Sequence, residues 1–242
     1  MRTVEAVLPD EIGRRDGLAY SLWLPSGSAP AGAVVILHGA GSCKENHHDF
    51  ARAAVAAGLA AVAFDQRGHG ESDGPMDDRA LDDVAGMARL ARDAAGTGRV
   101  PLGLRGSSMG GYLAIVAARA ARAQAVVAIC PASAEGLARG LRAGRLGFDA
   151  DAEALGRLLA AHDLHAAVAA LRDVPLLLLH AEGDEQVPVE HSRELAAAAA
   201  HPASRLLTVP GGHHRSVQHD PELQALSLRF LQRAFAAAAT AP

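Results

Sequence analysis

Residues 100–112 read Val-Pro-Leu-Gly-Leu-Arg-Gly-Ser-Ser-Met-Gly-Gly-Tyr, a short apolar run that enters a Gly-x-Ser-x-Gly turn and continues in a helical pattern to Ala121. A serine held in a tight turn between a strand and a helix needs small residues two positions away on either side, because a Cβ there would clash. Gly106 and Gly110 meet this need. Such a turn exposes the Ser108 hydroxyl at a helix N-terminus, where free N–H groups favour negative charge. We therefore predict that Ser108 is a nucleophile.

The rest of the chain alternates between strand patterns and helix patterns. Continuous apolar runs typical of strands buried on both faces occur at 33–38, 59–64, 125–130, 174–180 and 205–209. Helical spacing occurs at 49–58, 79–95, 152–161, 164–171, 190–200 and 221–238. Leu18 to Leu24 alternates apolar and polar residues, which predicts a half-buried strand near the edge of the sheet. This order predicts an α/β protein with a doubly wound, mostly parallel sheet and right-handed crossovers.

The length predicts one domain over residues 1–242. Residues 132–173 interrupt the alternation, with helical patterning and no convincing strand. A simple crossover needs only about a dozen residues, so the surplus predicts a small helical lid, inserted between core strands over their C-terminal ends. The alternative is an enlarged crossover with no role at the site.

Composition and charge limit the partners. The net charge is only −4, and the basic residues are scattered rather than clustered, so we expect no nucleic-acid binding and no anionic membrane surface as a partner. No run approaches the roughly 18 apolar residues of a membrane span, and Met1 to Pro9 is too short and charged for a signal peptide. We expect a cytoplasmic location, reduced thiols at Cys43 and Cys130, and leave a homodimer open.

A serine nucleophile needs a base to take its proton, and the base needs an acid to orient it. On a parallel sheet all three should follow the C-terminal ends of strands. Asp184 follows the predicted strand that ends at His180, and Pro-Gly-Gly-His-His-Arg at 210–215 follows the last predicted strand. The sequence therefore offers Asp184 as the acid and either His213 or His214 as the base.

Five segments in this order resemble the motifs of the α/β-hydrolase family, in its small carboxylesterase or dienelactone-hydrolase-like branch. They are His38-Gly39, the Asp-x-Arg-Gly-His-Gly-x-Ser segment 65–72, the Gly-x-Ser-x-Gly turn 106–110, the Gly-x-Asp-x-x-Val-Pro loop 183–188, and the glycine-containing histidine turn 211–214. The resemblance implies Ser108 as nucleophile, Asp184 as orienting acid and a late histidine as base. The register of the family's last motif favours His214, with His213 as the alternative.

The resemblance also implies an oxyanion hole made by the backbone N–H groups of Ala40 and Met109. It implies a structural role for His38. The segment 65–72, rich in charge and glycine, itself predicts a shaped turn braced by an Asp–Arg contact beside the pocket, rather than a phosphate loop. No metal is expected, because the adjacent histidines at 47–48 and 213–214 lack the face-matched spacing of a zinc site. No cofactor is expected either, because the Gly39-Ala40-Gly41 turn lacks the third glycine of a dinucleotide loop and has Lys44 in its place.

The function that the resemblance implies is cleavage of a small carboxylic ester through an acyl-enzyme, with a small-molecule ester or related acyl compound as substrate. Thioesterase, short-peptide hydrolase and C–C bond hydrolase activities stay open, because one fold hosts many chemistries. The alternative of another class is a non-catalytic member that uses the pocket to bind a ligand.

Overall fold

The structure is a computed structural model that describes residues 7–96 and 100–240. Most of the segment from which we argued against a signal peptide, residues 1–6, lies outside these ranges. Within the two ranges, none of the helices combines the length and the apolar character needed to cross a bilayer.

One eight-stranded sheet runs through the molecule in the order β1-β2-β4-β3-β5-β6-β7-β8. The strands are β1 (Glu11–Arg15), β2 (Leu18–Trp23), β3 (Ala33–Leu37), β4 (Ala60–Phe64), β5 (Leu102–Ser107), β6 (Ala125–Ile129), β7 (Leu176–Ala181) and β8 (Arg205–Val209). β1 and β4 pair with β2 in antiparallel fashion, and β4, β3, β5, β6, β7 and β8 pair in parallel. The predicted fold class, a mostly parallel α/β sheet, is confirmed.

Helices cover both faces of this sheet, which explains why its central strands are apolar at nearly every position. The main helices are α1 (His48–Ala56), α2 (Ala80–Ala94), α3 (Met109–Val116), α4 (Ala134–Arg142), α5 (Ala152–Ala161), α6 (Leu164–Ala170), α7 (Val189–Ala198) and α8 (Pro221–Thr240). α1 and α8 pack on one face, against alternate strand residues such as Val34 and Ile36. α2, α3 and α7 pack on the other face, where α2 and α3 contact β3 residues such as Val35 and Leu37 and α7 contacts β7 and β8.

The antiparallel edge of the sheet differs from our expectation. β2 is buried at all of its positions, and β1 rather than β2 is the edge strand, so the prediction of a half-buried strand there is wrong. β1 is mostly exposed and polar, and it shows no periodic pattern. Asp16 and Gly17 join the two strands with φ values of 53° and 82°, the left-handed conformation of a tight hairpin. The Asp-Gly pair was the sequence signal for β1.

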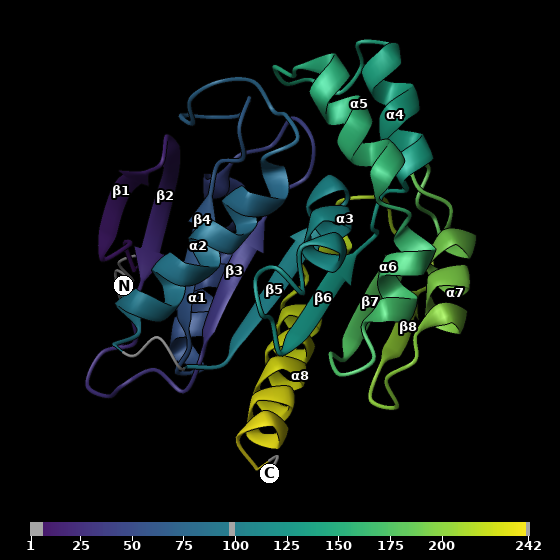
Figure 1. The fold of residues 1–242 in the computed structure, drawn as a ribbon. Coiled ribbons are helices and arrows are strands. Elements are labelled where there is room, and N and C mark those ends of the chain that lie inside the picture. The colour runs from purple at the N-terminus through teal and green to yellow at the C-terminus, as the bar shows by residue number, and fades with distance from the viewer. Residues whose placement is uncertain (1–6, 97–99, 241–242) are drawn as a thin grey trace, which may run out of the picture.

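Three helices lie between β6 and β7. α5 and α6 match the predicted helical segments, and α4 was missed. Their first turns are capped by Ser133, Asp151 and Asp163, whose side chains accept hydrogen bonds from backbone N–H groups. Figure 1 shows α4 and α5 as a pair beyond the arrowheads of β5 and β6, whereas α6 packs on α3 and α7 beside the sheet.

Candidate active site

Ser108 occupies the sharp turn between β5 and α3, with φ 52° and ψ −117°. Left-handed φ values are unfavourable for a residue with a Cβ, so the surroundings must hold this conformation. The Ser108 N–H donates to the Ile129 carbonyl at 2.8 Å, and its own carbonyl accepts from Tyr112 N–H at 3.0 Å. A Cβ on Gly106 would overlap the Gly110 carbonyl, and a Cβ on Gly110 would overlap the Leu37 carbonyl. Both glycines are therefore required by close backbone packing.

Asp184 and His214 lie together in the loops that follow β7 and β8. His214 Nδ1 is 2.6 Å from Asp184 Oδ2. The other carboxylate oxygen of Asp184 accepts from the N–H groups of Gln186 and Val187, at 2.8 and 3.0 Å. Burial works to raise the pKa of Asp184, but the hydrogen bonds it accepts outweigh burial and hold its pKa well below the ordinary value. Asp184 is thus an ionised acceptor for an imidazole N–H.

The alternative base, His213, and the two glutamates that flank Asp184 in the sequence lie elsewhere. His213 is exposed, and its Nδ1 accepts from the Arg215 N–H at 3.3 Å. Glu182 accepts from the Thr208 hydroxyl at 2.9 Å, and Glu185 is exposed. The structure brings His214, and not His213, to Asp184.

His180 supports the Asp184 loop and was missed by sequence reasoning. Its ring is fully buried, with Nδ1 2.7 Å from Ser192 Oγ and Nε2 2.9 Å from the Val187 carbonyl. Nε2 also lies 3.4 Å from Asp184 Oδ2. A polar histidine at the end of an otherwise apolar strand was the available signal, because a buried imidazole requires partners.

Ala40 lies in a turn beside Ser108, which closes through a hydrogen bond from Ser42 N–H to the Gly39 carbonyl at 3.2 Å. The next N–H group, on Gly41, donates to His69 Nε2 at 3.2 Å. A Cβ on Gly39 would lie 3.3 Å from Ser108 Cβ, so this turn and the serine are in close contact. The N–H of Met109 precedes the first hydrogen bond within α3 and has no acceptor inside that helix.

His38 is held from both sides by backbone. Its Nδ1 donates to the Gly39 carbonyl at 2.8 Å, and its Nε2 accepts from Gln66 N–H at 3.1 Å. Burial lowers the pKa of His38 to about 4. The ring is therefore neutral at neutral pH, and both of its nitrogens are already occupied.

The segment 65–72 is braced differently from the expected contact. Asp65 is buried, and its carboxylate lies 2.9 Å from Lys44 Nζ and accepts from Lys44 N–H at 2.7 Å. Arg67 instead reaches Asp83 on α2, with Nε 2.8 Å from Oδ2. An Asp–Arg contact therefore exists, but it ties the turn to α2, and a lysine from the neighbouring loop neutralises Asp65.

Comparison with known proteins adds to this geometry. Residues 28–146 match the family model "Serine aminopeptidase, S33", and residues 160–236 match "TAP-like protein". The chain belongs to the α/β-hydrolase superfamily. It is accordingly a serine hydrolase of this fold.

Two curated relatives illustrate the range of similarity. The monoacylglycerol lipase of Mycolicibacterium smegmatis is 29% identical over 250 residues, which cover 85% of this chain and 88% of the lipase. The uncharacterized protein YfhR of Escherichia coli K12 is 27% identical over 214 residues, covering 84% of this chain and 72% of YfhR.

Solved structures of other proteins share the fold. Est1E from Butyrivibrio proteoclasticus, solved with ferulic acid, has a TM-score of 0.68 at 22% identity and covers 93% of this chain and 98% of its own. DcsB, solved with a substrate analogue, has a TM-score of 0.74 at 19% identity, with 90% and 95% covered. The monoacylglycerol lipase of Paleococcus ferrophilus has a TM-score of 0.67 at 20% identity, with 91% and 98% covered.

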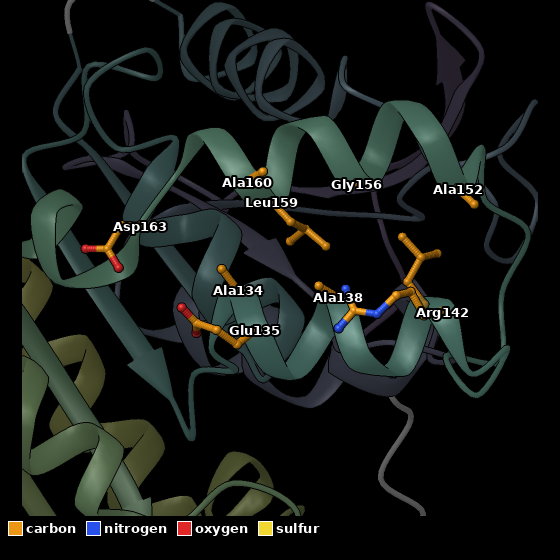
Figure 2. A pocket seen from close by; sticks show the side chains of 10 residues that line it. Ala134, Glu135, Ala138, Arg142, Ala152, Gly156, Leu159, Ala160 and Asp163 are labelled. Carbon is orange, nitrogen blue, oxygen red and sulfur yellow. The ribbon is translucent and has the colours of Figure 1, made fainter.

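Two hollows lie near the C-terminal ends of the hydrolase strands. One, of about 630 Å³, is lined by Ser108, Ala40 and residues of α4 and the loops that follow it. The other, of about 460 Å³, lies between α4 and α5, as Figure 2 shows, and Ser108 is not among its lining residues. The first is the candidate substrate cleft, because it contains the predicted nucleophile.

Two groups of metal-ligating side chains occur within residues 7–96 and 100–240. In the group of Cys130, His180 and Asp184, burial raises the pKa of the thiol to about 12, and both other side chains have hydrogen-bond partners, so these donors do not fit a metal. His165, His191 and Glu194 on α6 and α7 have donor atoms within 4.8 Å of one another, and their donor types suit a transition metal.

Proposed function

We propose that this hydrolase cleaves a small carboxylic ester through an acyl-enzyme. Ser108 attacks the carbonyl carbon, His214 takes the hydroxyl proton and returns it to the leaving alcohol, and Asp184 orients the imidazole. Water then attacks the acyl-enzyme with the same base. The carboxylesterase assignment is supported by the lipase and esterase names among the relatives and neighbours.

The observation that carries the proposal is the 2.6 Å contact between His214 Nδ1 and Asp184 Oδ2. A carboxylate on Nδ1 holds a neutral imidazole in the tautomer whose Nε2 is free to accept a proton. The same contact supports the choice of His214 over His213.

The proposed oxyanion hole consists of the N–H groups of Ala40 and Met109. Its support is the close approach of the Ala40 turn to Ser108 and the position of Met109 at the N-terminus of α3. Donors placed there stabilise the negative charge that develops on the carbonyl oxygen, and removing one donor costs about 10²- to 10³-fold in kcat.

We also propose that residues 132–173 form the lid, with α4 and α5 as the part that covers the site. Support comes from the cleft itself, which is lined both by α4 and by the Ser108 turn. α6 contributes to the sheet's helical layer instead.

The test begins with fluorophosphonate labelling of wild type, Ser108→Ala, His213→Ala and His214→Ala, followed by turnover of 4-nitrophenyl esters of increasing chain length. We expect one label per chain, lost in Ser108→Ala and His214→Ala and kept in His213→Ala. Labelling that depends on His213 instead would reverse the assignment of the base. A wild type that neither labels nor turns over esters would favour a non-catalytic, ligand-binding member.

Asp184→Asn provides a further prediction. We expect kcat to fall by about 10⁴-fold with the fold retained, because an amide favours the wrong imidazole tautomer. Circular dichroism and ester turnover measured together check this, and a fall of less than tenfold would contradict the role of Asp184.

Aminoacyl 4-nitroanilides and thioesters belong in the same substrate panel. The matching model named for a serine aminopeptidase is the specific reason to include peptides. Faster turnover of an aminoacyl anilide than of any ester would replace esterase by peptidase.

A further inference from the structure

The cleft over Ser108 carries an excess of positive charge, although the chain as a whole is acidic. Its lining includes Arg139 on α4, Arg145 in the loop after α4, and Arg215 directly after His214, and it includes no Asp or Glu. The net charge of the whole chain is −4. The charge in the cleft is therefore local and opposite in sign to that of the molecule.

These three guanidinium groups are free to meet a ligand. Some surface arginines are already paired with carboxylates, as Arg79 is with Asp77 at 2.6 Å and Arg193 with Glu190 at 2.8 Å. For the three cleft arginines, no carboxylate of the described residues lies within 4.0 Å. All three are exposed, so their donors are not consumed by the fold.

The neighbouring hollow between α4 and α5 shows the contrast. Figure 2 shows Arg142 directed into that hollow, where Glu135 and Asp163 also lie. Arg139 and Arg142 are three residues apart on the same helix, yet only Arg139 lines the cleft over Ser108. Of these two hollows, only the cleft that contains Ser108 has no acidic side chain in its lining.

The uncharged residues of the cleft lining indicate what kind of substrate chain the cleft can hold. Leu137, Leu146, Val187 and Pro188 supply aliphatic surface, and no Phe, Tyr or Trp lines the cleft. Arginine binds carboxylate and phosphate through two parallel hydrogen bonds and does so better than any other side chain.

Building on the proposed esterase function, we propose that the preferred substrates are esters whose short aliphatic part ends in a carboxylate or phosphate, which Arg139 and Arg145 on the lid side of the cleft bind. Arg215 adds to the positive potential from the opposite loop. The arginines are binding residues that determine specificity, and Ser108 remains the reacting group.

The test compares 4-nitrophenyl hydrogen adipate with 4-nitrophenyl hexanoate, which differ only by a carboxylate or a methyl group at the end of the acyl chain. We expect wild type to favour the adipate ester by about tenfold or more in kcat/KM, and the preference to fall as salt rises, because exposed charges are screened. In Arg139→Gln/Arg145→Gln we expect most of the preference to be lost through a higher KM. Arg215 is left intact because its neighbour is the proposed base.

Arg142→Gln is the matched control. It removes one guanidinium from the helix that carries Arg139, but outside the cleft, so the adipate-to-hexanoate ratio should stay at the wild-type value. An equal loss in Arg142→Gln and in the double variant would overturn the proposal, because the effect would then reflect the charge of the whole lid. A wild-type ratio of one or below would overturn it as well.

A binding experiment separates this inference from the ester chemistry. Calorimetry on Ser108→Ala measures the binding of adipate and of hexyl phosphate, with hexanol as the neutral reference. Binding of either anion that is lost in Ser108→Ala/Arg139→Gln/Arg145→Gln supports the anion subsite even if no ester is hydrolysed, and the ligand that binds more tightly distinguishes carboxylate from phosphate. If neither anion binds while neutral esters are turned over, the anion subsite is contradicted and the proposed esterase function is retained.

Discussion

Ser108 stores backbone strain that its neighbours must balance. A non-glycine residue in this region costs about 1–3 kcal/mol and persists only where surrounding contacts hold it. Here the serine's N–H and carbonyl are both bonded to backbone of adjoining elements, at 2.8 and 3.0 Å. The hydroxyl is consequently held on a rigid turn, which reduces the reorganisation needed for the proposed attack.

His69 connects the segment 65–72 to the proposed oxyanion hole. Its Nδ1 donates to the Arg67 carbonyl at 3.0 Å, which leaves Nε2 as the acceptor for Gly41 N–H. Burial lowers the pKa of His69, so the ring stays neutral and keeps this acceptor. The ring is also stacked on Phe148, with centroids 4.2 Å apart.

We predict that His69→Phe lowers kcat by about 10- to 100-fold with little change in KM. Phenylalanine keeps the ring that stacks on Phe148 but has no acceptor for the Gly41 N–H, so the turn that carries Ala40 loses this hydrogen bond. The effect should be smaller than the roughly 10²- to 10³-fold cost of deleting an oxyanion-hole donor, because the Ala40 N–H itself remains. Steady-state kinetics measure the split between kcat and KM.

Phe148→Leu is the control for this prediction, because it removes the ring stack and leaves the Gly41 hydrogen bond. It should keep kcat within about threefold of wild type, since the donor geometry is unaffected. An unchanged kcat in His69→Phe would contradict the positioning role.

At the scale of elements, β5 serves two parts of the site. Ser108 directly follows the last residue of β5. Arg105, also on β5, donates to the Gln218 carbonyl at 2.7 Å, and Gln218 lies in the short 3₁₀ helix (Val217–His219) that follows His214. The Arg105 guanidinium also lies 3.9 Å from the centre of the Phe50 ring. Burial lowers the pKa of Arg105 to about 10. One strand thus positions both the proposed nucleophile and the loop of the proposed base.

Two glycine-to-alanine changes should shift stability in opposite directions. Gly106→Ala places a Cβ against the Gly110 carbonyl, so we expect the free energy of unfolding to fall by about 2 kcal/mol or more and turnover to be lost. The Cβ added by Gly156→Ala, within α5, would meet no atom within 4 Å. We expect this change to raise the free energy of unfolding by about 0.5–1 kcal/mol, because alanine favours helix more than glycine does. Urea denaturation measures both, and a stable, active Gly106→Ala would contradict the elbow packing.

At the scale of the whole molecule, buried neutral histidines make stability depend on pH. Burial lowers the pKa of His38 to about 4 and that of His47 well below its ordinary value. Both should return to about 6.5 on unfolding, so the unfolded chain binds more protons between these values. The stability that these neutral rings contribute is complete above about pH 6.5 and is lost as pH falls towards 4.

We therefore predict a decrease in the free energy of unfolding of about 3 kcal/mol or more between pH 7 and pH 4.5, before most carboxylates titrate. Asp184 contributes outside this window, because its pKa is lowered in the fold and its contribution is lost only below its unfolded value near 4. Urea unfolding at several pH values measures the slope. A free energy of unfolding that stays constant from pH 7 to 4.5 would contradict this prediction. As a control, His213→Gln replaces an exposed histidine and should leave the pH dependence of stability unchanged.

Local patterns in the sequence determined most of the architecture. Runs such as 33–37 and 125–129 are apolar at each position, and only a strand covered on both faces buries them all. The elbow was equally readable from the spacing of Gly106, Ser108 and Gly110, although only the Gly106 clash lies within the turn; a Cβ on Gly110 would meet the Leu37 carbonyl of β3. Prediction from hydrophobic periodicity failed for β1. This strand is polar and mostly exposed, and it is held by pairing with β2 rather than by burial, so its sequence shows no hydrophobic pattern.

The tertiary structure decided which distant groups meet. The choice between His213 and His214 depends on how the loop after β8 packs against Asp184, thirty positions earlier. The pairing of Asp65 with Lys44, and the single-signed charge of the cleft, likewise depend on which side chains the fold turns towards one another. The spacing of hydrophobic residues indicates how each segment is buried against the core. Contacts between distant segments depend on the order of the strands and the geometry of the loops, and the chemistry of the site depends on those contacts.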